Sequence, residues 1–147
     1  YHGISTQIIA QIKNVRVPFN VDIGVGDIIV PRAEERTINT QLPDFEAPVI
    51  KTYSLESTIA EKFDAILQRF ELTGRMKDFY DIYYLSRTFD FEGAKLQAAI
   101  FETLQRRGTP YDRDSFKRVV ALADDEDMQK RWKFFLKTIK DNTLEFP

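Results

Sequence analysis

The sequence predicts an α+β protein in which a short antiparallel β-sheet is followed by a helical bundle. Apolar residues alternate from Tyr1 to Ile12 with the period of two that is typical of a strand. From Leu55 onward they recur at the spacing of one helix face. Glycine and proline punctuate the segments between. We therefore divide the chain into a strand-rich part, residues 1–53, and a helical part, residues 54–147.

The composition fits one globular domain. The 147 residues suffice for a hydrophobic core, and the 43% hydrophobic and 30% charged content excludes a disordered chain. No apolar run approaches the roughly 20 residues that span a membrane, and no signal peptide is visible, so we expect no membrane partner. Cysteine is absent, which excludes disulfides and thiolate metal sites and is compatible with a cytoplasmic protein. The net charge of −2 argues against a generally basic nucleic-acid-binding surface but leaves a local patch open.

The N-terminal part predicts an antiparallel hairpin. Tyr1 to Ile12 forms the first strand, Lys13-Asn14 is a turn signal, and Val15 to Ile23 forms the second strand. Residues 32–44 are polar and predict a loop. The run from Val49 to Tyr53 predicts another short strand before the helices begin.

Five helices are predicted after Ser54, which is a good N-cap for the first of them. We expect them at Leu55 to Phe70, Met76 to Arg87, Phe91 to Arg107, Asp112 or Asp114 to Leu122, and Asp124 to Lys140. Their buried stripes include Ile59, Phe63, Ile66 and Phe70 in the first helix, Phe116, Val119 and Val120 in the fourth, and Trp132, Phe135, Leu136 and Ile139 in the last.

Asp22 is the first candidate for chemistry. It lies within an apolar strand, where a charge is costly unless it is paired or faces water. A carboxylate at a strand end is a hard oxygen ligand suited to Mg²⁺. One carboxylate does not make a metal site, so an aspartate that faces water or caps the turn at Gly24–Gly26 is the alternative.

Lys62 and Arg69 stand two turns apart on one side of the first predicted helix. A lysine can hold a phosphate as a point charge, whereas an arginine offers a planar fork. The alternative is that they join Glu61 and Asp64 in a solvated face with weak ion pairs.

A denser cluster of charges follows on the second helix, where neighbours three residues apart meet on the helix surface. It consists of Arg75, Lys77, Asp78 and Asp81. Two readings stay open. The cluster is either an ion-pair knot that docks this helix on the previous one, or the wall of an active site. The charges alone do not decide, because structural ion-pair networks and active sites perturb charges in the same way.

Three segments carry a resemblance when they are taken in order. FNVDIGVGDIIVP joins an aspartate-bearing strand to a GD turn and a proline. YSLESTIAEKFDAILQRF places a tyrosine, a glutamate and AEK ahead of a leucine-rich helix. RMKDFYDIYYL has the form R-x-K-D-x-x-D. Their order and spacing resemble those of the AbiEii/AbiGii nucleotidyltransferase toxin family, over about Gly3 to Leu85.

The resemblance implies a polymerase-β-like nucleotidyltransferase core joined to a helical part, in a toxin of a toxin–antitoxin or abortive-infection system. Members are thought to transfer a nucleotide from an NTP, with tRNA as the acceptor in some relatives. The implied partners are therefore an NTP, a nucleic-acid acceptor such as tRNA and an antitoxin protein, and the implied cofactor is Mg²⁺.

The resemblance also implies roles for single residues. Asp22 would match a metal-binding carboxylate beside the attacking hydroxyl, Lys62 a lysine near the triphosphate, and Asp78 the KD aspartate. The residues implied to support the substrate are Arg69, Arg75, Lys77 and Asp81.

One motif of the family does not occur in this sequence: a Gly-Gly-Ser/Thr turn followed by D-x-D or D-x-E. We expect those carboxylates upstream of Tyr1, in a longer protein of which this chain is a fragment. The alternatives are an inactive relative that binds protein or RNA, and an unrelated α+β domain whose charges form only an ion-pair knot. For these residues alone we expect weak binding of nucleotide and Mg²⁺.

Overall fold

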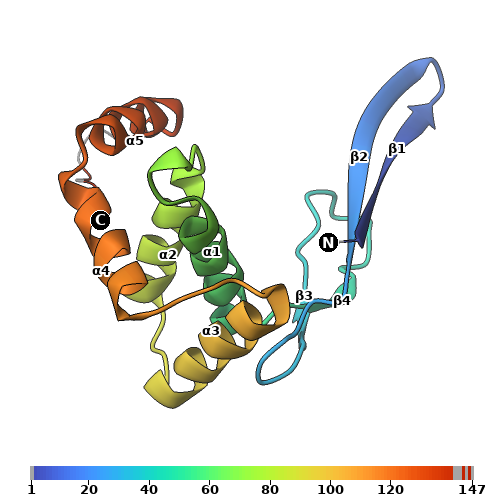
Figure 1. Ribbon diagram of the computed structural model, residues 1–147. Coiled ribbons are helices and arrows are strands. Elements are labelled where there is room, and N and C mark those ends of the chain that lie inside the picture. The colour runs from blue at the N-terminus through green and yellow to red at the C-terminus, as the bar shows by residue number, and fades with distance from the viewer. Residues whose placement is uncertain (1, 141–143, 145, 147) are drawn as a thin grey trace.

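The computed structural model describes residues 2–140, 144 and 146 and confirms the α+β class (Figure 1). The strands are β1 (His2–Ile12), β2 (Val15–Val25), β3 (Glu34–Thr37) and β4 (Val49–Thr52). The helices are α1 (Leu55–Arg69), α2 (Met76–Thr88), α3 (Gly93–Arg107), α4 (Arg113–Ala121) and α5 (Glu126–Thr138), with 3₁₀ turns η1 (Phe70–Leu72) and η2 (Leu122–Asp124).

Strands β1 and β2 form the predicted antiparallel hairpin. Its register runs from Ile12 opposite Val15 at the turn to His2 opposite Val25. Lys13 adopts a positive φ of 52°, which closes the predicted turn. The hairpin extends away from the helices in Figure 1, and its apolar side chains remain exposed on both strands.

The predicted loop over residues 32–44 is partly wrong, because β3 lies within it. β3 pairs with β4 in antiparallel register, from Glu34 opposite Thr52 to Thr37 opposite Val49. The hydroxyl of Thr52 also donates to the carbonyl of Glu34, at 3.2 Å. The polar sequence EERT shows no apolar alternation, so its strand conformation depends on the pairing with β4.

Helix α1 lies at the junction of the helical part and packs against α2, α3 and α4. Ser54 caps it as predicted, since its side chain accepts a hydrogen bond from the Ser57 amide at 3.1 Å. Ile59 and Ile66 of the predicted stripe are buried. Their burial leaves the opposite side of α1 available to polar residues.

A hydrophobic core forms where α1, α2 and α5 meet. It contains Ile66, Met76, Phe79, Leu122, Met128, Trp132 and Leu136. Two residues of the predicted stripes are exposed instead of buried. Val120 is 75% exposed because it follows Val119 by a rotation of about 100° and faces outward. Ile139 is 39% exposed because α5 ends before it.

No helix within the described part of the chain is long and apolar enough to cross a membrane.

Candidate functional site

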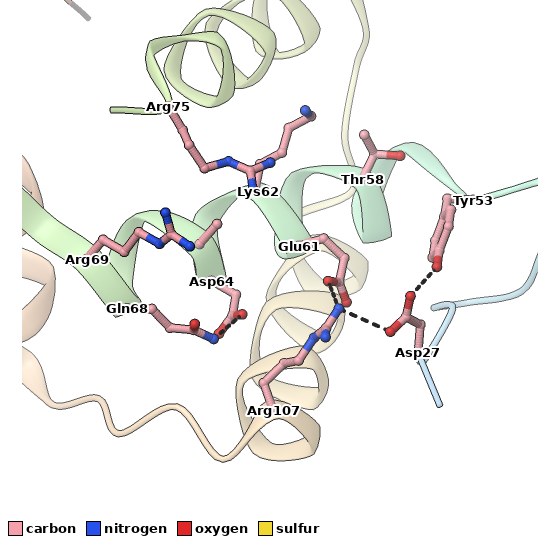
Figure 2. A pocket seen from close by; sticks show the side chains of 11 residues that line it. Asp27, Tyr53, Thr58, Glu61, Lys62, Asp64, Gln68, Arg69, Arg75 and Arg107 are labelled. Atoms are coloured by element: carbon pink, nitrogen blue, oxygen red, sulfur yellow. Dashed lines mark hydrogen bonds and ion pairs between the residues drawn. The ribbon is translucent and has the colours of Figure 1, made fainter. Parts of the chain in front are cut away.

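A cavity of about 640 Å³ opens along the polar side of α1 (Figure 2). Residues from the loop after β2, from the start of α2 and from the end of α3 complete its lining. The charged lining falls into two groups: the cations Lys62, Arg69 and Arg75, and a network of Asp27, Glu61, Asp64 and Arg107.

The structure brings together four residues that the sequence singled out. Asp78 is 1% exposed on α2, and its carboxylate accepts a hydrogen bond from Arg75 Nε at 2.5 Å. Lys62 Nζ lies 2.7 Å from Asp81 Oδ2 and 3.4 Å from Asp78 Oδ1. These pairs link α1 to α2 and hold the Lys62 ammonium at the edge of the cavity.

Arg69 and Lys77 take no part in these ion pairs. Arg69 lines the same cavity with an exposed side chain, and no hydrogen bond or ion pair engages it among the described residues. Lys77 is exposed and lines a second cavity instead, against α5. The cavity beside α1 therefore has one cation that no carboxylate of the described chain neutralises.

Asp22 lies elsewhere. It sits on β2 opposite Ser5, it is exposed, and it is not among the described residues that line the cavity. The structure thus joins Lys62 to Asp78 but does not bring Asp22 to them. Its role as a metal ligand stays a prediction.

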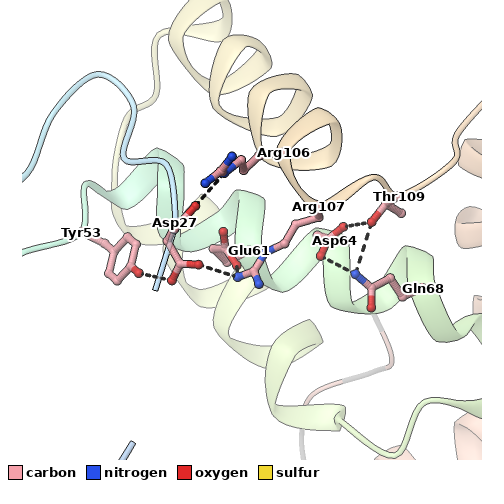
Figure 3. A network of polar contacts seen from close by, with 9 residues as sticks. Asp27, Tyr53, Glu61, Asp64, Gln68, Arg106, Arg107 and Thr109 are labelled. Atoms are coloured by element: carbon pink, nitrogen blue, oxygen red, sulfur yellow. Dashed lines mark hydrogen bonds and ion pairs between the residues drawn. The ribbon is translucent and has the colours of Figure 1, made fainter. Parts of the chain in front are cut away.

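A second polar network ties the loop after β2 to the helices (Figure 3). Asp27 accepts a hydrogen bond from the Tyr53 hydroxyl at 2.5 Å and lies 3.1 Å from Arg107 Nη2. The same guanidinium forms an ion pair with Glu61 on α1. Arg106 Nε donates to the Gly26 carbonyl at 2.8 Å. These contacts fix the end of the hairpin against α1 and α3.

Asp64 contradicts the solvated-face alternative, because its side chain is buried at 4% exposure. Its carboxylate accepts hydrogen bonds from Thr109 Oγ1 and from Gln68 Nε2, the latter at 2.8 Å. Burial raises the pKa of Asp64 above the ordinary carboxyl value, and these hydrogen bonds oppose that rise. Burial likewise raises the pKa of Glu61, against the attraction of Arg107.

Sequence reasoning missed Asp27, Tyr53 and Arg107 as members of the site. The GD turn at Asp27 was part of the motif evidence, but its partners lie far away along the chain. For Asp64, the available signal was a carboxylate two residues before the apolar pair Ile66-Leu67 on the same helix.

The described residues do not form a complete metal centre among themselves. No group of three or more histidine, aspartate or glutamate side chains gathers among them in a way that could hold a metal ion. Asp78 and Asp81 each face Lys62 instead of an open coordination position.

The fold and this cavity define an α+β protein with a charged pocket along α1. Residues 1–146 match the family described as nucleotidyl transferase AbiEii toxin, Type IV TA system, and the chain belongs to that family. The match confirms the resemblance seen in the motifs and extends it through the later helices. No curated protein and no solved structure matches the chain.

Proposed function

We propose that this chain supplies the phosphate-binding wall of a nucleotidyl-transfer site, in which the cavity beside α1 receives an NTP. The supporting observation is that Lys62, Arg69 and Arg75, from two helices, line one cavity. A triphosphate needs several cations at close range, and this cavity offers a lysine with two arginine forks.

In the proposed reaction, a hydroxyl of the acceptor attacks the α-phosphorus of the NTP. A new P–O bond forms, the hydroxyl proton passes to solvent, and the bond to the leaving pyrophosphate breaks. Cations held in place beforehand stabilise the charge that develops on the pyrophosphate. Asp78 and Asp81 position Lys62 for this task, and Arg69 and Arg75 hold the phosphates. Lys77 supports the substrate from the start of α2.

The proposal extends to cofactor and partners. Enzymatic transfer of this type commonly uses divalent metal, and Asp22 is our candidate ligand for Mg²⁺, to be tested by titration. A nucleic acid such as tRNA is the proposed acceptor. The family description names a toxin, which supports an antitoxin protein as the counterpart in the cell.

A second candidate function is a binding module without catalysis. The observation in its favour is that Asp78 and Asp81 already neutralise Lys62, and Asp78 also pairs with Arg75. Such a prepaired cluster stabilises the docking of α2 on α1 without any ligand. The two functions differ in one measurable property, the transfer of label.

The test follows α-³²P from labelled NTPs into RNA, together with growth arrest when the protein is expressed in cells. Lys62→Ala, Asp78→Ala and Asp22→Ala should each lower transfer by about 100-fold or more, the scale of a lost electrostatic contact in the transition state. Lys117→Ala, on the exposed side of α4, is the control. Thermal unfolding checks that each variant is folded.

Retained transfer and growth arrest in all three variants would contradict the assignment. If the unaltered protein, expressed from its complete reading frame, binds RNA or a protein but transfers no label from any NTP, the binding module is the correct function.

A further inference from the structure

A second cavity, of about 520 Å³, lies between the start of α2 and the exposed side of α5. Arg75 lines both this cavity and the one beside α1. The two cavities therefore adjoin at Arg75. A ligand that occupies the second cavity approaches the phosphate side of the first.

The side of α5 that faces this cavity is cationic with an exposed aromatic ring. Lys130, Phe134 and Thr138 recur at four-residue spacing and line the cavity, and Lys137 lies on the same side of the helix. Phe134 is 71% exposed. The core-facing side of α5 already buries Trp132 and other apolar residues, so this ring is not needed for packing.

The charges of this surface are available to a ligand. Lys77, Lys133 and Lys137 are exposed, and no contact engages their ammonium groups within the described part of the chain. Lys130 pairs with Asp127 at 3.1 Å, but both side chains are about seven-tenths exposed. Such surface pairs contribute little and exchange readily for another anion.

The cavity walls are held in place. Arg131 Nη1 donates at 2.9 Å to the carbonyls of both Glu71 and Thr73, just before α2 begins. These bonds fix α5 against the loop that leads into Arg75 and Lys77. The surface is therefore positioned before any ligand arrives, which reduces the entropic cost of binding.

We propose that this α5 surface, comprising Lys77, Lys130, Phe134 and Lys137, binds the single-stranded end of the acceptor nucleic acid and leads it past Arg75 to the NTP. This rests on the proposed function. Polynucleotide binding combines cations along the phosphates with aromatic rings on which bases stack, and both are present here. An acidic protein would use the lysines but has no need of the exposed ring.

The experiment measures binding of a fluorescent 12-nucleotide single-stranded RNA to the chain by anisotropy, at several salt concentrations. Phe134→Ala should weaken binding about tenfold, within the range that base stacking contributes. Lys130→Glu should weaken RNA binding and reduce the slope of the logarithm of the binding constant against the logarithm of salt concentration by about one. A DNA oligonucleotide of the same sequence tests whether the 2′-hydroxyl matters.

The chain offers a matched control. Lys117 is 71% exposed on α4 and pairs with an aspartate three residues before it at 2.9 Å, as Lys130 does on α5. Lys117→Glu changes the net charge equally and should leave RNA binding unchanged. Val120→Ala, which removes an equally exposed apolar side chain, is the control for Phe134.

The outcomes separate this inference from the proposed function. NTP binding, followed by filter retention, should be lost in Arg69→Ala and kept in Phe134→Ala. Equal effects of Lys117→Glu and Lys130→Glu on RNA, or no effect of Phe134→Ala, would overturn the α5 surface even where NTP binds. Stronger binding of polyglutamate than of RNA would assign the surface to an acidic protein. If RNA binds through Phe134 but the protein expressed from its complete reading frame binds no NTP, the surface is confirmed as an RNA site and the proposed transfer fails.

Discussion

At the scale of single residues, Asp64 shows how burial reverses the expected behaviour of a helix-surface carboxylate. Its buried carboxylate accepts hydrogen bonds from Gln68 on α1 and from Thr109 after α3, and these two neutral donors replace only part of its lost hydration. The resulting rise in its pKa means that the folded protein binds a proton more tightly there than the unfolded chain does.

Stability should therefore respond to pH at this position. In the window between the ordinary pKa of 3.8 and the raised folded-state pKa, the folded state holds more protons at Asp64 than the unfolded state. The contribution of this group then falls as pH rises through that window. Asp64→Asn removes this titrating carboxyl. The free energy of unfolding of the original protein minus that of the variant should therefore increase as the pH is lowered.

Urea denaturation at a series of pH values measures this difference. Asp114→Asn, at a side chain that is 84% exposed, is the control and should give a curve parallel to that of the original protein. A difference for Asp64→Asn that grows with rising pH would reverse the sign of the argument.

At the scale of elements, Arg107 connects three segments. Its guanidinium, at 12% side-chain exposure, reaches Asp27 after β2 and Glu61 on α1 from the last turn of α3. In such a pair each charge stabilises the other, because removing one of them would leave its partner partly buried and unpaired. Arg107 thus helps to hold the hairpin end against the helices, together with the hydrogen bond from Arg106 to the Gly26 carbonyl.

Arg107→Gln should lower the free energy of unfolding by about 2 kcal/mol, below the range for fully buried pairs because some water reaches the site. The double variant Arg107→Gln, Glu61→Gln should recover part of that loss, because it also removes an uncompensated carboxylate. Denaturant unfolding of the two single variants and the double variant measures this coupling. A single-variant loss below about 0.5 kcal/mol would indicate an ordinary surface pair.

At the scale of the whole molecule, the helical part has a buried core, whereas the β1–β2 hairpin extends from it with exposed apolar side chains. The two parts should therefore respond differently to substitution. Burial decides how much a large-to-small substitution lowers the free energy of unfolding, because only a packed side chain leaves a cavity behind.

Leu104 is 0% exposed on α3. Leu104→Ala should lower the free energy of unfolding by about 2–5 kcal/mol. Ile9 is 57% exposed on β1. Ile9→Thr should lower the free energy of unfolding by less than about 0.5 kcal/mol. Thermal unfolding of the two variants, each compared with the original protein, measures the contrast. A cost for Ile9→Thr near that of Leu104→Ala would show that the hairpin is packed in solution.

The elements predicted correctly are those whose signal is local. Alternation from residue 2 to 25 and the apolar stripe of α1 each reflect one face of one element, which neighbours in the sequence reveal. Strand β3 was missed because its polar residues depend on β4, and no local pattern encodes that pairing. Within the site, Lys62 and Asp78 were found because each belongs to one of the motifs, AEK for Lys62 and R-x-K-D-x-x-D for Asp78.

The sequence by itself determined the α+β class, the hairpin, the helices and the family, because periodicity, caps and motif order are properties of neighbouring residues. Only the tertiary structure decided which charges meet. It joined Lys62 to Asp78, placed Asp22 away from them on an exposed strand, and brought Arg107 to the loop after β2. Such contacts join segments far apart in the chain, and their formation depends on how the helices pack, which no local pattern records.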